Sequence, residues 1–120
     1  MKQRPEISLV VPVLNEETII QELVARSKAA LASVVPSWEI ILVDDGSTDD
    51  TLAAICTERA LDPSIRYISF SRNFGHQMAI TAGLDKAEGH CVVIMDGDLQ
   101  DPTELVPQLY AKAGQGFDVV

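Results

Sequence analysis

Acidic side chains follow several apolar runs of this chain, and their spacing favours metal-ion chemistry. Asp96 and Asp98 flank Gly97 directly after one such run, and Gln100 follows them. In an extended segment, residues i and i+2 point to the same side, so both carboxylates can face one ion while Gly97 lets a ligand approach the backbone. Carboxylate and amide oxygens are ligands for hard cations such as Mg²⁺ and Mn²⁺. The segment therefore predicts a divalent metal held by Asp96 and Asp98, with Gln100 supplying a neutral oxygen.

Two further acidic groups follow earlier apolar runs. Glu16 comes after the first run, and Asp44 and Asp45 end the second. In an open parallel sheet, ligands bind outside the carboxyl ends of the strands, so these groups are expected to meet at one rim with Asp96. Carboxylates gathered in this way repel one another, which favours a cation among them. For Asp44 and Ser47 a second interpretation stays open, namely a turn residue and a helix cap.

Apolar β-branched runs alternate with helix-like segments, and this alternation predicts the elements that position the acids. Strands are predicted at residues 7–13, 39–43, 66–70 and 91–95, and helices at 17–34, from 47 or 48 to 60, 75–87 and 102–113. The strands are apolar at consecutive positions, as in a parallel sheet with helices on both faces. The pattern predicts an α/β fold. Residues 117–120 begin a fifth strand, so the domain at 1–120 is expected to be truncated there.

Composition and charge limit the classes of function. The 120 residues carry 9 Lys+Arg and 18 Asp+Glu, a net charge of −9, which argues against nucleic-acid binding. The apolar runs reach about a third of the ~20 residues that a membrane span needs, and no signal peptide is evident, so a cytoplasmic location is expected. Cys56 and Cys91 are isolated, which favours reduced thiols over a zinc site.

Five segments carry a resemblance to a known family. They are the residues at 11–16 (VPVLNE), 43–47 (VDDGS), 71–75 (SRNFG), 82–84 (AGL) and 95–102 (MDGDLQDP). In this order they resemble the N-terminal part of family 2 glycosyltransferases, in particular the polyprenyl-phosphate sugar transferases that include dolichyl-phosphate mannosyltransferase and bactoprenol glucosyltransferase. One departure is Gly97, where relatives often carry Ala. Another is length, since the acceptor-binding half of the family would follow residue 120.

The resemblance implies a fold and a nucleotide site. The fold is the Rossmann-like, nucleotide-binding half of a GT-A type glycosyltransferase. By position, Pro12, Leu14 and Glu16 line the nucleotide pocket, and Asp45 contacts the base or ribose with Asp44 as its neighbour. The donor implied is a nucleotide diphosphate sugar.

The resemblance also implies a reaction: inverting transfer of the sugar to an acceptor, a polyprenyl phosphate. Asp96, Asp98 and Gln100 would hold Mg²⁺ or Mn²⁺ on the diphosphate, where the ion stabilises the charge of the leaving group. The two aspartates would thus be catalytic through the metal. A lipid phosphate is already ionised, and the base that a sugar hydroxyl would require lies beyond this chain in the family. Arg72 is either a contact to the nucleotide or a solvated loop residue.

Two other functions remain open from the sequence. A non-catalytic nucleotide-binding fragment is one, because the acceptor half is absent from these residues. A receiver-like signalling domain is the other, because its size and clustered aspartates are similar. A receiver, however, needs an acidic pair after its first strand, where this chain has Leu14-Asn15-Glu16. Full-length relatives are expected at the cytoplasmic face of the membrane, held by segments absent here, and the open sheet edge of a truncated piece favours self-association.

Overall fold

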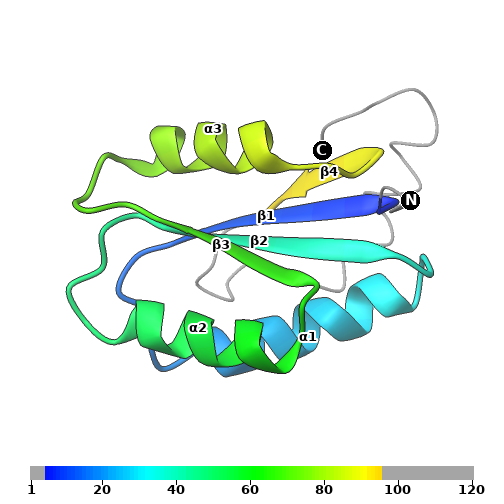
Figure 1. Ribbon diagram of the computed structural model, residues 1–120, viewed down its shortest axis with the longest axis horizontal. Helices are drawn as coiled ribbons and strands as arrows, with labels where there is room; N and C mark the ends of the chain where they lie inside the picture. The colour runs from blue at the N-terminus through cyan, green and yellow to red at the C-terminus, as the bar shows by residue number, and fades with distance from the viewer. Residues whose placement is uncertain (1–4, 96–120) are drawn as a thin grey trace.

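The computed structural model describes residues 5–95, which form a parallel sheet covered by helices on both faces (Figure 1). The elements in chain order are β1 (Ile7–Val13), α1 (Ile20–Ala32), β2 (Trp38–Asp44), α2 (Thr51–Leu61), β3 (Ile65–Ser69), α3 (His76–Lys86) and β4 (Cys91–Ile94). The four strands lie in the order β3-β2-β1-β4, and every neighbouring pair is parallel. The predicted α/β architecture is confirmed, while the helix predicted at 102–113 and the strand predicted at 117–120 lie outside the described residues. None of the described helices is long and apolar enough to cross a membrane.

The larger core lies between the sheet and the helices α1 and α2. Because side chains alternate along a strand, Leu9 and Val11 of β1 share the face that α1 and α2 cover. They belong to one buried cluster with Leu23 of α1 and Ile55 of α2. All residues of β1 are buried, which explains why its sequence is apolar at nearly every position.

Helix α3 covers the opposite face of the sheet (Figure 1). Val10 of β1 and Val43 of β2 form a second buried cluster there with Ala79 of α3. Gly83 brings the helix close to the sheet, because a Cβ at this position would lie 2.3 Å from Cγ1 of Val10. The two clusters hold the central strands β1 and β2 from both sides.

One predicted helix start is wrong. Helix α2 begins at Thr51, and the residue before it, Asp50, makes no side-chain cap hydrogen bond. Ser47 and Thr48, the predicted caps, bind another loop instead. The Ser47 hydroxyl accepts a hydrogen bond from the Asn15 N–H at 2.9 Å, and the Thr48 N–H donates to Oδ1 of Asn15 at 2.8 Å. The polar residues that look like a helix cap therefore join two loops that are far apart in the sequence.

A buried carboxylate ties the strands together at the amino-terminal end of the sheet. Glu39 of β2 is only 6% exposed. It accepts hydrogen bonds from the Ser8 hydroxyl at 2.5 Å, from the Glu88 N–H at 2.8 Å and from Nη1 of Arg66 at 2.7 Å. Burial acts to raise the pKa of Glu39, but the hydrogen bonds from Ser8, Glu88 and Arg66 outweigh it and hold the pKa below its ordinary value.

This pKa predicts how stability depends on pH. Because the pKa of Glu39 is lower in the folded chain than its unfolded value of about 4.3, the carboxylate stabilises the fold above that pH. The contribution is lost as the pH falls through the folded pKa. We expect the parent chain to unfold at a higher temperature than Glu39→Gln at pH 7, and the difference to shrink below pH ~4. Thermal unfolding between pH 3 and 7, followed by circular dichroism with the exposed Asp85→Asn as control, measures this. A difference that does not vary with pH contradicts it.

Candidate functional site

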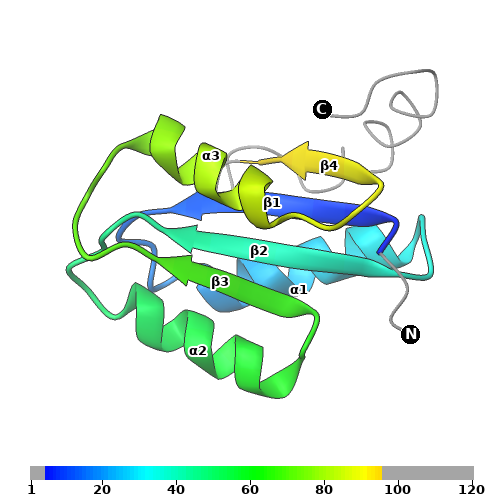
Figure 2. The same cartoon turned by 45° about the horizontal axis from the view of Figure 1, so that its top comes forward.

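The loops after β1, β2 and β3 gather at one end of the sheet, where the strand arrows point in Figure 2. We call residues 14–19, 45–50 and 70–75 of these loops the carboxyl-end rim. The register pairs Val13 of β1 with Asp44 of β2, and Asp44 with Ser69 of β3, so the three strands end side by side. Glu16 and Asp45 therefore lie at the same edge of the sheet, as the sequence predicts.

Asn15 joins the first loop of the rim to the second. Its backbone φ is +53°, a left-handed conformation that asparagine tolerates better than most residues. Both its side chain and its N–H are hydrogen-bonded to Ser47 and Thr48 of the second loop. The next amide, that of Glu16, donates to Oγ1 of Thr51 at 2.8 Å. The first loop is thus attached to the second through several separate contacts.

Asp45 joins the second loop to the third. Asp45 is 5% exposed, and its carboxylate accepts hydrogen bonds from the Phe74 N–H at 2.9 Å and from the Gly75 N–H at 3.1 Å. Gly75 is the residue before α3, so the carboxylate lies at the positive end of that helix dipole. Asp44 is also buried and accepts from the Ser47 N–H at 3.0 Å, the turn contact that the sequence leaves open. Backbone amides therefore fix the orientation of both carboxylates.

Gly46 allows the second and third loops to touch. Its φ is +78°, and a Cβ at this position would lie 2.2 Å from the carbonyl carbon of Arg72 and 2.5 Å from the Asn73 nitrogen. Glycine adopts this conformation readily and leaves room for the approaching backbone. The glycine of the segment at 43–47 therefore has a packing role in the rim.

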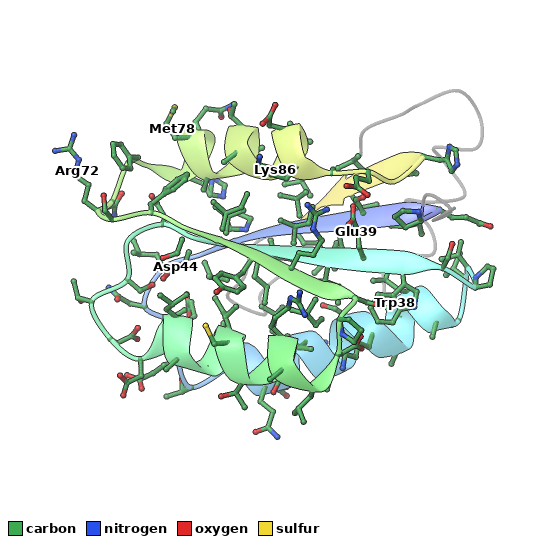
Figure 3. The ribbon with its side chains drawn as sticks, in the orientation of Figure 1. Trp38, Glu39, Asp44, Arg72, Met78 and Lys86 are labelled. Carbon is green, nitrogen blue, oxygen red and sulfur yellow. The ribbon has the colours of Figure 1, made fainter. Side chains whose placement is uncertain are left out.

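The third loop presents a cation and an aromatic ring to solvent. The guanidinium of Arg72 lies 4.8 Å from the centroid of the Phe74 ring, a cation–π distance. Phe74 is 46% exposed and meets Phe70 edge to face, with 5.5 Å between the ring centroids. Figure 3 shows Arg72 projecting from this end of the molecule. Arg72 is thus open to an anionic ligand, and its predicted contact to the nucleotide stays a prediction.

The other predicted nucleotide residues lie on or beside the first loop. Leu14 is 37% exposed and Glu16 is half-buried, so both line the rim. Pro12 is buried within β1. Its place in a nucleotide pocket, like the contacts predicted for Leu14, Glu16 and Asp45, stays a prediction.

The predicted metal site lies outside the described residues. Its predicted ligands are Asp96, Asp98 and Gln100, and Gly97, predicted to let the nucleotide approach the backbone, lies outside the described residues as well. The described chain leads directly to it, because the Met95 N–H donates to the Val10 carbonyl at 3.0 Å beside β1. Between residues 5 and 95, no group of three or more His, Cys, Asp or Glu side chains could hold a metal ion. The metal prediction therefore depends on the segment at 96–100.

A cavity of about 370 Å³ lies at the other end of the sheet, among residues that include Trp38, Glu39 and Arg66. Figure 3 shows Trp38 and Glu39 far from Arg72 and the rim. Two of its charged groups pair, since Nη1 of Arg66 contacts Glu39 at 2.7 Å, and the same nitrogen donates to the Lys86 carbonyl at 3.0 Å. The hydrogen bonds of Glu39 and Arg66 in this lining join neighbouring strands, which is a structural role.

The sequence of the rim and its β-strands matches a known family over nearly the whole chain. The sequence profile described as Glycosyl transferase family 2 matches residues 8–120. The chain belongs to glycosyl transferase family 2. This membership excludes the receiver-like alternative.

Curated relatives of this family 2 chain are longer proteins. It is 42% identical over 120 residues to the uncharacterized glycosyltransferase YkcC of Bacillus subtilis, covering 100% of this chain and 37% of the relative. It is 46% identical over 116 residues to the undecaprenyl-phosphate 4-deoxy-4-formamido-L-arabinose transferase of Pectobacterium carotovorum, covering 95% of this chain and 35% of the relative. The chain thus spans little more than a third of these relatives.

Solved structures confirm the predicted GT-A type fold of this family 2 chain. The mannosyltransferase PcManGT from Pyrobaculum calidifontis, in complex with GDP-Man and Mn²⁺, matches with a TM-score of 0.67 and 25% identity over 84% of this chain and 34% of its own. S. aureus TarS in complex with UDP-GlcNAc matches with a TM-score of 0.63 and 30% identity over 78% of this chain and 26% of its own.

Proposed function

We propose that this chain is the nucleotide-sugar-binding part of a metal-dependent, inverting glycosyltransferase that transfers a sugar from a nucleotide diphosphate sugar to a polyprenyl phosphate. The observation that carries the proposal is the rim itself. Hydrogen bonds hold the backbone of Glu16 and the carboxylates of Asp44 and Asp45 at the carboxyl ends of parallel strands, directly beside the point where the chain leads to Asp96. This is the edge at which open α/β sheets bind their ligands.

Similar structures support the donor. PcManGT holds GDP-Man, and TarS holds UDP-GlcNAc. These two donors share a nucleoside diphosphate bonded to a sugar and differ in base and sugar. We therefore propose a nucleoside diphosphate sugar as the donor, without choosing the base or the sugar. Leu14, Glu16 and Pro12 would line the nucleoside. Asp45 would contact the base or ribose through lone pairs that its backbone partners leave, and Arg72 would contact the diphosphate.

The charge of the site supports a divalent cation. A diphosphate would enter a rim that already holds buried carboxylates, in a chain whose net charge is −9, and a cation offsets that repulsion. Asp96, Asp98 and Gln100 offer the carboxylate and amide oxygens that Mg²⁺ and Mn²⁺ prefer, so this donor set fits the ion. When bound there, the metal supplies Lewis-acid stabilisation of the departing diphosphate. The Mn²⁺ in the PcManGT complex supports this choice.

One relative supports the acceptor, because its name gives undecaprenyl phosphate. A lipid phosphate is ionised at neutral pH and can attack the anomeric carbon in line, which inverts that centre. The task of the residues described here is then to bind and orient the donor, with no general base assigned to them. We place the working protein at the cytoplasmic face of a membrane, where such a lipid and a water-soluble nucleotide sugar meet.

Binding and transfer are tested separately. We expect UDP or GDP to bind the 120-residue chain in the presence of Mn²⁺ and to bind much more weakly after chelation, as measured by isothermal titration calorimetry. The chain alone should transfer little sugar from UDP- or GDP-sugars to undecaprenyl phosphate, because it covers about a third of its relatives. Binding without transfer by a chain extended to the length of its relatives would favour the non-catalytic alternative. Absence of any nucleotide binding contradicts the proposal.

A further inference from the structure

We infer that Asn15 is a positioning residue of the nucleotide site, which holds the loop carrying Leu14 and Glu16 against the loop carrying Asp44 and Asp45. The inference rests on the proposed function. Asn15 would affect nucleotide binding through the neighbouring residues, since its Oδ1 and its N–H both bind the second loop of the rim.

The first loop of the rim needs such a contact because burial does not fix it. Every residue from 14 to 19 is exposed or half-buried, so apolar packing supplies little restraint. Hydrogen bonds replace it. The Thr48 N–H donates to Asn15 Oδ1 at 2.8 Å, and the Asn15 N–H donates to Ser47 Oγ at 2.9 Å. A backbone turn from the Ile19 N–H to the Glu16 carbonyl at 3.1 Å holds the far side of the loop.

Ser47 extends this contact to the buried acid of β2. Its hydroxyl accepts from Asn15, while its own N–H donates to Oδ1 of Asp44 at 3.0 Å. Asn15, Ser47 and Asp44 thus form a continuous series of hydrogen bonds across two strand ends. Because Asp44 is buried at the end of β2, these hydrogen bonds connect Asn15 to the sheet. Loss of the Asn15 side-chain amide would remove the contact to Thr48 and leave the first loop held by the N–H groups of Asn15 and Glu16.

The backbone of Asn15 makes the test specific. Its φ of +53° is one that glycine also adopts, so Asn15→Gly removes the side chain with little added strain. The control is Ser33→Ala at the other end of α1, which removes one side-chain hydrogen bond, from Ser33 Oγ to the Ala30 carbonyl at 2.7 Å. Asn15→Gly removes two, from the Thr48 N–H at 2.8 Å and from its hydroxyl at 3.4 Å. Each change is expected to lower the unfolding temperature by roughly 5 °C.

Only Asn15→Gly should change ligand binding. We expect the affinity of the full chain for UDP or GDP with Mn²⁺, measured by calorimetry, to fall about 10-fold in Asn15→Gly and to stay unchanged in Ser33→Ala. If the parent chain binds and Asn15→Gly binds equally well, the positioning role is overturned while the proposed function stands. If the parent chain does not bind at all, both are overturned.

A double-mutant cycle separates positioning from direct contact. Ser47→Ala removes the acceptor of the Asn15 N–H and leaves the Asn15 side chain in place. If Asn15 and Ser47 together hold the first loop against the second, the double variant should lose less nucleotide affinity than the sum of the losses in the two single variants. Fully additive losses would mean that Asn15 acts on the affinity independently of Ser47, and would overturn the inference that the two residues position the loop together.

Discussion

Asp98→Asn is expected to lower the affinity for a nucleoside diphosphate in the presence of Mn²⁺ by more than ~100-fold, because even the partners of metal ligands are worth about 10- to 100-fold. The change keeps the shape of the side chain and removes its charge, and an amide oxygen is a poorer ligand for a hard cation. The unfolding temperature of the metal-free chain should hold or rise slightly, since the change removes one of two like charges that are only two positions apart in the sequence. Calorimetry with Mn²⁺ and nucleotide, beside thermal unfolding without metal, measures both effects.

A helix cap at Asp98 would give the opposite result. Asparagine caps helices as well as aspartate does, so a purely structural Asp98 predicts unchanged affinity in Asp98→Asn. Asp85→Asn, which removes one exposed charge from α3, controls for the change in net charge. Unchanged affinity in both variants would remove Asp98 from the metal site.

Gly46→Ala is expected to destabilise the fold by about 3 kcal/mol, the sum of left-handed strain and overpacking. The added Cβ would lie 2.2 Å from a backbone atom of Arg72, so the third loop of the rim has to move. That movement should weaken the hydrogen bonds from Phe74 and Gly75 to Asp45, and with them nucleotide binding. Urea denaturation gives the free energy of unfolding, and calorimetry gives the affinity.

Gly75→Ala separates strain from collision. Gly75 also has a positive φ, +105°, but nothing lies within 4 Å of a Cβ built there. We expect Gly75→Ala to lose the free energy of backbone strain alone, about 1–3 kcal/mol, because its φ of +105° and ψ of 156° lie in a region that essentially only glycine adopts. A loss in Gly46→Ala no greater than the roughly 1–2 kcal/mol of left-handed strain would show that the approach of the second loop to the third contributes nothing.

The strands of this fold follow from local sequence, and the start of α2 does not. The run at 7–13 is apolar at nearly every position, which both predicts β1 and matches its burial on both faces. The polar segment before α2 looks like a helix cap to any local criterion. Ser47 and Thr48 bind Asn15 instead, a residue more than thirty positions away in the sequence. Such a competition between a local cap and a distant partner is decided only when the strands have assembled.

The candidate site also combines features that the sequence predicts with features that depend on distant partners. The acids after β1 and β2 are predicted at one edge because strand direction alone brings them there. What their carboxylates bind depends on a third loop, since the partners of Asp45 are amides of Phe74 and Gly75 that follow β3. The role of Gly46 likewise appears only when Arg72 comes against it. A glycine after two acids is visible in the sequence, but the backbone that it must accommodate is not.

The central position of β1 has a consequence for synthesis of the chain. β1 is synthesised before the other three described strands, yet it lies between β2 and β4, and its pairing with β4 joins Ile7 to Cys91. Contacts of such sequence separation slow folding, because the loop between them must close first. Synthesis adds about 5–20 residues per second, so one edge of this largely apolar strand stays unpaired for on the order of ten seconds before β4 is made. The nascent chain is most exposed to aggregation, and to capture by chaperones, in that interval.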